Sequence, residues 1–237
     1  MRTVIHAEGI TKSFGFQKVL RGLDFTAEEQ ETVALMGPNG AGKTTLLYVL
    51  ATLLAPESGS IAYFGQPLKN NEIEIRRRLG IVGHQLMLYA DLTVEENLNF
   101  YTKMYTLSNR EQRMTAVLDL VDLNKHRRQL VRTLSRGMQQ RLTIARAMLH
   151  DPLLLFLDEP FAGLDQGMTE KMLQLVQKIT SQNKTVVFVT HNFREVSLLA
   201  TRVLFLKAGN FVGNYEVTGM DEHDLSERYQ TVMQPTI

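Results

Sequence analysis

The chain has 237 residues, of which 44% are hydrophobic, and its formal net charge is +1. This size and composition indicate a folded protein with a sizeable core, and the near-neutral charge argues against nonspecific nucleic-acid binding as its main function. The sequence contains no cysteine, which excludes disulfides, thiolate catalysis, cysteine-bound zinc and iron–sulfur clusters. No apolar stretch approaches the ~20 residues that span a bilayer, and the N-terminus shows no secretory signal.

The first part of the chain, residues 3–36, predicts antiparallel strands with turns at Gly15 and at residues 28–31. The apolar run at 33–36 is followed at once by the sequence G-P-N-G-A-G-K-T at 37–44. Glycines in such a loop allow a tight curl in which successive backbone N–H groups point inward at an anion. A helix predicted over 43–54 adds its positive N-terminal end to the same site.

This loop has the chemistry of a site for a nucleoside triphosphate. Lys43 is placed to reach the β- and γ-phosphates, and the Thr44 hydroxyl is a ligand for Mg²⁺. A tight turn before a helix is the alternative, but the coincidence of strand, loop, lysine and threonine favours the nucleotide. The residues expected to contact it are Gly37, Pro38, Asn39, Gly40, Ala41, Gly42, Lys43, Thr44 and Thr45.

The middle of the chain changes from strands to helices. Residues 60–64 predict a short strand, and a helix over 72–78 leads to a strand over 79–82. From 94 to 122 the apolar spacing is helical, and Asp91 or Thr93 is the expected cap of the first helix.

The second half alternates helices and strands. This alternation predicts a mainly parallel sheet with helices on both faces. The purely helical stretch 86–130 interrupts it, so we expect a separate helical lobe. The elements predicted are a helix over 137–149, a strand over 153–158, a helix over 167–182, a strand over 184–189, a helix over 192–199 and a strand over 202–206.

Two strand ends carry polar residues with chemical potential. The strand 153–158 ends in Asp158 and Glu159, at the sheet edge where ligands of open α/β sheets bind. Asp158 suits Mg²⁺, and Glu159 suits the polarisation of an attacking water as general base. His191 follows the next strand and would face the same edge, although a lone histidine is more often structural than catalytic.

A further segment, L-S-R-G-M-Q-Q-R at 134–141, joins these motifs, and together they resemble the nucleotide-binding subunits of ATP-binding-cassette (ABC) transporters. The resemblance covers roughly residues 3–215, and the parts occur in the order found in the family. It favours a functional His191. The parts are an aromatic residue (Phe14), the phosphate loop, Gln85, the signature at 134–138, the Asp158–Glu159 pair, Asp165 and His191.

The resemblance implies an α/β fold: a P-loop NTPase core with a mainly parallel sheet, an N-terminal antiparallel β subdomain and an inserted helical subdomain. The core would comprise about 1–84 and 131–215, the helical subdomain about 85–130, and the tail 216–237. The acids at Glu216, Asp221, Glu222 and Asp224 predict a solvated surface there.

The resemblance also assigns site roles, with ATP and Mg²⁺ as cofactors. Glu159 and His191 would orient the attacking water, and Gln85 would sense the γ-phosphate. Phe14 would stack on adenine. The Mg²⁺ ligands implied are Thr44, Gln85 and Asp158, and the other nucleotide contacts are Ser135, Gly137 and Asp165.

The signature departs from the usual L-S-G-G-Q at two positions, Arg136 and Met138. The groups expected to touch phosphate are the Ser135 hydroxyl and the Gly137 N–H, and both are present. We therefore expect ATPase activity to be retained.

The resemblance implies a head-to-tail dimer, whose second subunit is another copy or a relative of this chain, and an integral membrane subunit that supplies the transport pathway. The protein would lie peripherally on the cytoplasmic face of the inner membrane, and nucleic acid is not an expected partner. A groove within 83–105 would receive a helix of the membrane subunit, and Leu86, Met87, Leu88 and Tyr89 are candidate contacts, although they fit the core of the helical lobe equally well.

The signature form resembles bacterial exporter subunits, and residues 83–98 with 159–165 look most like the ATPase of cytochrome c maturation, the haem exporter subunit. Export of another cargo, such as a drug, lipid or polysaccharide, is the alternative. A soluble ABC-type ATPase acting on ribosomes or DNA is a second one. It is disfavoured because no coiled-coil insertion separates Gln85 from Leu134.

Overall fold

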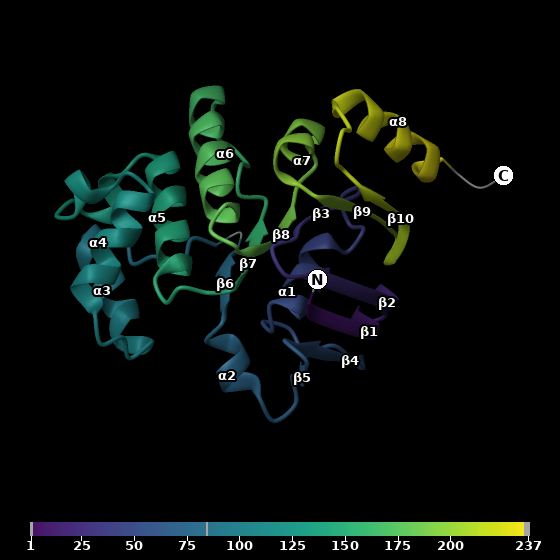
Figure 1. The fold of residues 1–237 in the computed structure, drawn as a ribbon, viewed down its shortest axis with the longest axis horizontal. Coiled ribbons are helices and arrows are strands. Elements are labelled where there is room, and N and C mark those ends of the chain that lie inside the picture. Colours follow the sequence, from purple (N-terminus) through teal and green to yellow (C-terminus); the bar gives the residue numbers. More distant parts are fainter. Residues whose placement is uncertain (1, 84, 235–237) are drawn as a thin grey trace.

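The computed structural model describes residues 2–83 and 85–234, so His84 lies outside the described residues. Two β-sheets with helices around them form the fold (Figure 1). The larger sheet has the strand order β10-β9-β3-β8-β7-β6, and the smaller has the order β2-β1-β4-β5. The strands are β1 (Thr3–Phe14), β2 (Gln17–Glu28), β3 (Thr32–Met36), β4 (Ser58–Tyr63), β5 (Gln66–Pro67), β6 (Leu79–Val82), β7 (Leu154–Asp158), β8 (Thr185–Val189), β9 (Arg202–Lys207) and β10 (Asn210–Glu216).

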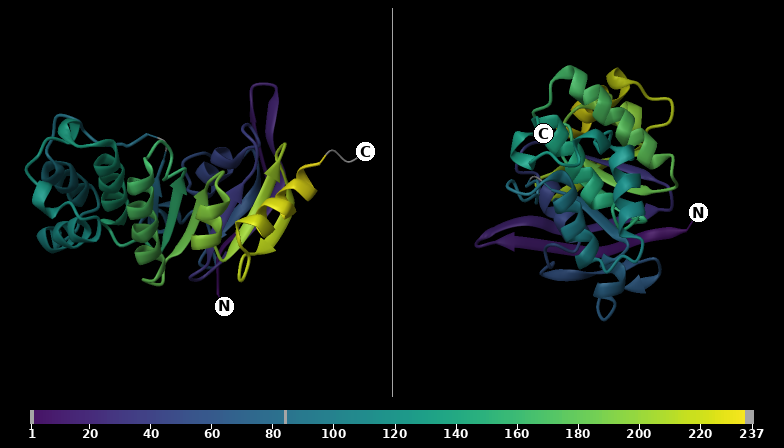
Figure 2. Two further views of the ribbon diagram at one scale, coloured as in Figure 1. Left: turned by 90° about the horizontal axis from the view of Figure 1, so that it is seen from above. Right: turned by 90° about the vertical axis from the view of Figure 1, so that its left-hand side faces the viewer.

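Apart from α2, which contacts β6, the helices fall into three groups around the sheets (Figures 1 and 2). Helices α3, α4 and α5 gather beyond the β6 edge of the larger sheet, α6 to α8 cover one of its faces, and α1 lies on its other face. The helices are α1 (Lys43–Leu50), α2 (Glu72–Arg76), α3 (Val94–Met104), α4 (Arg110–Leu120), α5 (Arg136–Met148), α6 (Gln166–Thr180), α7 (Phe193–Leu199) and α8 (Glu222–Met233), with short 3-10 turns at Asn124–His126 and Val131–Thr133.

The prediction of antiparallel pairing over all of residues 3–36 was wrong for its last strand. β1 and β2 do pair antiparallel, but β3 pairs in parallel with β8 and β9 in the larger sheet. All five residues of β3 are buried. A strand buried on both faces reads as a continuous apolar run, which is typical of the interior of a parallel sheet.

The pleat of the larger sheet divides the core into two clusters. Met36 and Leu157 pack on the side of α5, α6 and α7, whereas Leu35 and Phe156 pack on the side of α1 and the smaller sheet. Successive strand side chains point to opposite faces, so one apolar run serves both layers. Helix α1, which follows the phosphate loop, is thus held between the two sheets.

The helical lobe forms as the apolar spacing predicts, with two helices where 94–122 was expected to be helical. Thr93, rather than Asp91, caps α3: its hydroxyl accepts from the Glu96 N–H, and the Glu96 carboxylate accepts from the Thr93 N–H. Among the described residues, no helix is long and apolar enough to cross a membrane.

The predicted end of the first helix was wrong. Helix α1 ends at Leu50 rather than residue 54, because Thr52 takes a left-handed backbone conformation with φ of 61°. The acids near the C-terminus are exposed, as predicted, and Asp221 also caps α8, its carboxylate accepting hydrogen bonds from the N–H groups of His223 and Asp224.

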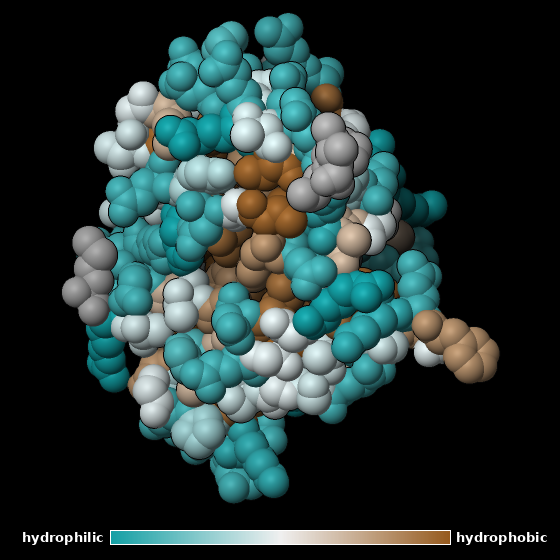
Figure 3. Space-filling model, turned by 90° about the vertical axis from the view of Figure 1, so that its right-hand side faces the viewer, coloured by the Kyte–Doolittle hydropathy of each residue, from teal (hydrophilic) through white to brown (hydrophobic). Residues whose placement is uncertain are grey.

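The side of the molecule where β1, β2, β9 and β10 lie presents a hollow with an apolar floor and a polar rim (Figure 3). A cavity between the sheets on this side is lined by Phe25, Leu204 and Phe211, with His6 and Asp24 among its polar residues.

Candidate ATP site

The phosphate loop joins β3 to α1 and depends on glycine at specific points. Gly37, Gly40 and Gly42 have φ values of 157°, 77° and 105°, which other residues rarely adopt. Gly37 also has no room for a side chain, because a Cβ there would lie 2.1 Å from the carbonyl oxygen of Leu206. The loop is therefore fixed against β9 by close backbone approach.

Lys43 lies across this loop, as an anion-binding lysine should. Its ammonium donates to the carbonyl oxygens of Gly37 at 2.8 Å and Pro38 at 3.0 Å. The residue is only 7% exposed. Burial lowers the pKa of Lys43 from its usual value, and the charges of Glu159 and Asp158 oppose that change. The cation is thus held by neutral carbonyls that an anionic ligand can replace.

The structure brings Thr44 and Asp158 together from positions far apart in the sequence. The Thr44 hydroxyl donates to the Asp158 carboxylate at 3.0 Å, and Asp158 is 4% exposed at the end of β7. These hard oxygen donors fit Mg²⁺, which commonly takes one or two protein ligands together with substrate phosphates and water. No cluster of three or more His, Asp or Glu side chains suited to a metal occurs within residues 2–83 and 85–234.

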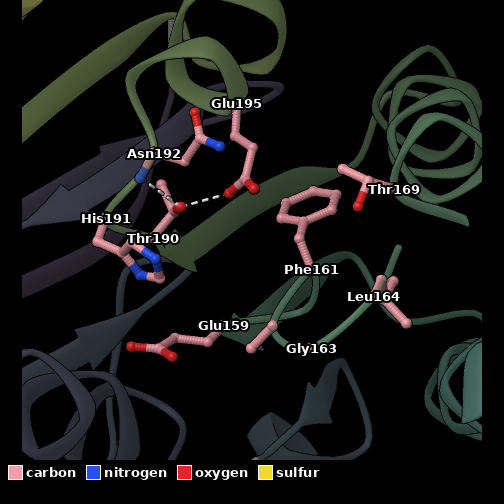
Figure 4. A pocket seen from close by; sticks show the side chains of 10 residues that line it. Glu159, Phe161, Gly163, Leu164, Thr169, Thr190, His191, Asn192 and Glu195 are labelled. Atoms are coloured by element: carbon pink, nitrogen blue, oxygen red, sulfur yellow. Dashed lines mark hydrogen bonds between the residues drawn. The ribbon is translucent and has the colours of Figure 1, made fainter. Parts of the chain in front are cut away.

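Glu159 and His191 both line one cavity of about 250 Å³ (Figure 4). Glu159 is half-buried and has φ of 48°, a conformation that is costly for a residue with a side chain. Its N–H is bonded to the Val189 carbonyl at 3.2 Å, so β8 holds it in place. His191 is exposed, directly after β8. The structure therefore brings both predicted residues to one edge of the sheet.

Two buried residues of this cavity, Thr190 and Glu195, were not among the predicted site residues. The Thr190 hydroxyl donates to the Glu195 carboxylate and accepts from the Asn192 N–H at 3.1 Å. Burial raises the pKa of Glu195, while the bond from Thr190 and the nearby His191 act in the opposite direction. Glu195 lies on α7, four residues after His191, where a sequence pattern shows only an acid in a helical first turn.

The signature residues lie at the start of α5. Ser135 caps the helix, its hydroxyl accepting from the Met138 N–H at 3.3 Å, and Gly137 is buried against α6, where a Cβ would lie 2.9 Å from Met168 Sδ. Neither residue is hydrogen-bonded to the phosphate loop within the described part of the chain. Arg136 does line a cavity of about 410 Å³ together with Asp158 and Glu159.

Arg136 is also in contact with the loop after β7. Its guanidinium donates weakly to the Ala162 carbonyl at 3.4 Å. A Cβ on Gly163 would lie 2.4 to 2.6 Å from three guanidinium atoms, so the flat face of the group covers Gly163. Arg136, the first residue that departs from the usual signature, therefore packs against its own subunit.

The remaining predicted residues are spread around these cavities. Phe14 ends β1 and is 51% exposed, so its ring is open to a ligand. Thr45 is half-buried in the first turn of α1, and Gln85 is exposed. Asp165 caps α6, its carboxylate accepting from the Met168 N–H at 2.8 Å, a structural role that was not predicted.

The comparison with known families decides the class. The family model described as ABC transporter matches residues 20–162, which include the phosphate loop and the Asp158–Glu159 pair. The chain belongs to the ABC transporter ATP-binding family. It is therefore an ATPase, as the sequence predicted.

Named relatives and solved structures agree with this family. The linearmycin resistance ATP-binding protein LnrL of Bacillus subtilis is 33% identical over 211 residues, covering 88% of this chain and 68% of that protein. The bacitracin transport ATP-binding protein BcrA of Bacillus licheniformis is 35% identical over 213 residues, covering 90% and 69%. A solved ATP-binding subunit of an ABC transporter has a TM-score of 0.85 at 26% identity, covering 98% of this chain and all of the other.

One further solved relative represents a state after ATP hydrolysis. The ATP-binding cassette MJ0796 was captured as a dimer in a post-hydrolysis state with ADP and Pi, and it matches with a TM-score of 0.81 at 29% identity, covering 91% of this chain and 100% of that one.

The unusual signature gives the first prediction. We expect the double variant Arg136→Gly, Met138→Gln to change ATP turnover by less than about tenfold, or about 1.4 kcal/mol of barrier. The Ser135 hydroxyl and the Gly137 N–H are unaltered, and Arg136 loses a long hydrogen bond to Ala162 and its packing over Gly163. The measurement is phosphate release by both proteins at saturating ATP. A wild-type protein without turnover, made active by these two changes, would contradict the prediction.

Proposed function

We propose that this chain is the ATP-binding and ATP-hydrolysing subunit of an exporter-type ABC transporter complex, with Mg²⁺ as its second cofactor. The observation that carries the proposal is the contact between the Thr44 hydroxyl and the Asp158 carboxylate, with Glu159 directly beside it. This contact supports the proposal because the phosphate loop, the oxygen donors of Thr44 and Asp158, and the Glu159 carboxylate lie at one edge of one sheet. That is the arrangement that in-line attack of water on a γ-phosphate requires.

Each group then has a defined task. Lys43 and the N-terminal N–H groups of α1 hold the phosphates, and Thr44 and Asp158 hold Mg²⁺, with Gln85 as a further ligand. The bound Mg²⁺ would neutralise phosphate charge. Glu159 accepts the proton of the attacking water, and His191 contacts the γ-phosphate. Phe14 stacks on adenine.

We further propose a head-to-tail dimer of two copies. Ser135 and Gly137 of one copy would meet the triphosphate held by the other, with Asp165 close to the same nucleotide. The exposure of Ser135 and its place at a helix N-terminus support this assignment. In this proposal residues 1–84 and 131–215 form the catalytic core, 85–130 the helical subdomain and 216–237 the tail.

A membrane subunit is the second proposed partner, which would place the protein peripherally on the cytoplasmic face of the inner membrane. Of the four candidate contact residues, Met87 and Tyr89 are 44% and 49% exposed, whereas Leu86 and Leu88 are half-buried. The Tyr89 ring packs edge-on against the exposed Phe100, at a centroid distance of 5.1 Å. Exposed aromatic and methionine side chains next to one another are typical of a protein interface.

For the cargo we propose a small exported compound. The names of relatives support this class. LnrL and BcrA are named for linearmycin resistance and bacitracin transport, and a further relative from Rhizobium meliloti, 33% identical over 239 residues, is named for Nod factor export. Haem handling in cytochrome c biogenesis is the second candidate. Its support is the sequence resemblance of residues 83–98 and 159–165, whereas the relatives named above refer to other compounds.

Capture from native membranes tests the complex. The tagged Glu159→Gln variant is isolated from detergent-solubilised membranes with ATP and Mg²⁺, its partners are identified by mass, and the haem absorbance band is recorded. We expect a stoichiometric multi-span protein without haem. Haem-handling partners would favour the second cargo, and ribosomal proteins or nucleic acid without a membrane protein would contradict the transporter proposal.

A further inference from the structure

His191 lies in a turn whose backbone is not stabilised by the His191 side chain. Among the described residues, the His191 ring has no hydrogen-bond partner, and the residue is exposed after the end of β8. Its neighbours on both sides, Thr190 and Asn192, are instead fixed by hydrogen bonds. The backbone on either side therefore sets the direction of the Cα–Cβ bond from which the imidazole extends.

The bonds that fix this turn converge on one buried carboxylate. The Asn192 N–H donates to the Thr190 hydroxyl oxygen at 3.1 Å, which leaves the single hydroxyl proton of Thr190 to point at the Glu195 carboxylate. Thr190 is 2% exposed and Glu195 is 6% exposed. Buried polar groups keep such bonds because water cannot replace them. Figure 4 shows this chain of bonds running beside the His191 ring.

Helix capping does not account for the position of the Glu195 carboxylate. The side chain of Asn192 caps α7 by accepting from the Arg194 N–H at 2.9 Å. The Glu195 carboxylate turns back to Thr190, into the cavity that Glu159, Phe161 and His191 also line. A charged side chain buried at an ATPase site, with its bond directed at the turn that carries His191, points to a role in the reaction.

We propose that Glu195 is a positioning residue for ATP hydrolysis, which through Thr190 holds the 190–192 turn so that His191 faces the γ-phosphate beside Glu159. This inference rests on the proposed function, because it assumes that His191 acts on bound ATP. Glu195 itself touches no reacting atom in this scheme. The same bond network defines the variants that test it.

The first test is steady-state ATP hydrolysis by five variants. We expect Glu195→Ala and Thr190→Val each to lower kcat about ten- to a hundredfold, because His191 loses its orientation. KM for ATP should be nearly unchanged, because the residues that bind the nucleotide are intact. The conservative variants Glu195→Gln and Thr190→Ser keep an acceptor and a hydroxyl and should retain most of the activity. The double variant Glu195→Ala, Thr190→Val should be no slower than the slower single variant.

Epistasis with His191 separates positioning from a general loss of structure. In a His191→Ala background, Glu195→Ala should have no further effect on kcat, since its effect passes through the missing ring. A further loss of the same size as in wild type would overturn the proposal. Equal loss of activity in Glu195→Gln and Glu195→Ala would also overturn it.

A measurement without ATP keeps the inference separate from the proposed function. Amide hydrogen exchange of nucleotide-free protein should show faster exchange at Asn192 in Thr190→Val than in Thr190→Ser, with exchange in β3 and β7 unchanged. No difference at Asn192, or acceleration throughout the molecule, would contradict the network itself. If exchange at Asn192 is faster in Thr190→Val but the wild-type protein fails to hydrolyse ATP, the proposed function is refuted and the network stands.

Discussion

Replacement of Glu159 by glutamine is expected to lower ATP turnover about 10²- to 10⁴-fold, the range for loss of a general base, while ATP still binds. The amide has nearly the same shape but cannot accept the proton of the attacking water. The phosphate loop, Thr44 and Asp158 are unchanged, so the nucleotide stays bound between the two proposed subunits. We therefore expect an ATP-stabilised dimer, measured by light scattering with ATP and Mg²⁺ alongside phosphate release.

A matched acid-to-amide change provides the control. Glu29 is exposed directly after β2, away from the residues that line either cavity of the site. The variant Glu29→Gln should keep wild-type turnover and show no ATP-dependent dimer beyond that of wild type. A Glu159→Gln protein that stays monomeric with ATP and Mg²⁺, or that turns over at the wild-type rate, would contradict the proposed role.

The second large effect is expected at Gly37. Alanine there would bring Cβ to 2.1 Å from the Leu206 carbonyl oxygen in a backbone conformation that disfavours side chains. Overpacking against rigid backbone together with this strain should lower the free energy of unfolding by roughly 2–4 kcal/mol. The loop would move away from β9, so the rise in melting temperature on adding ATP should also be lost.

Gly40 in the same loop is the matched control. Its φ of 77° is also left-handed, but a Cβ there would meet nothing within 4 Å. Gly40→Ala should therefore lower the free energy of unfolding by only about 1 kcal/mol, from backbone strain alone. Thermal unfolding of both variants with and without ATP measures the difference. Equal destabilisation by the two changes would show that the close approach to Leu206 is not what fixes Gly37.

Much of the fold could be predicted because its signals are local. The helices at 94–104 and 110–120 follow their apolar spacing, and the strand before the phosphate loop is an apolar run of the expected length. The direction in which that strand pairs could not be predicted, since pairing joins β3 to β8 and β9, more than a hundred residues away. The prediction of antiparallel pairing failed for this reason.

The sequence by itself determined the chemistry of this protein: a glycine loop with Lys43 and Thr44, an acidic pair after a buried strand, and from their order the ABC family. Only the tertiary structure decided which groups meet. The bond from Thr44 to Asp158 and the shared cavity of Glu159 and His191 depend on strands that are neighbours in the sheet and distant in the chain. The role proposed for Glu195 also depends on the tertiary structure, because an acid in a short helix becomes informative only when its burial and its hydrogen-bond partner are known.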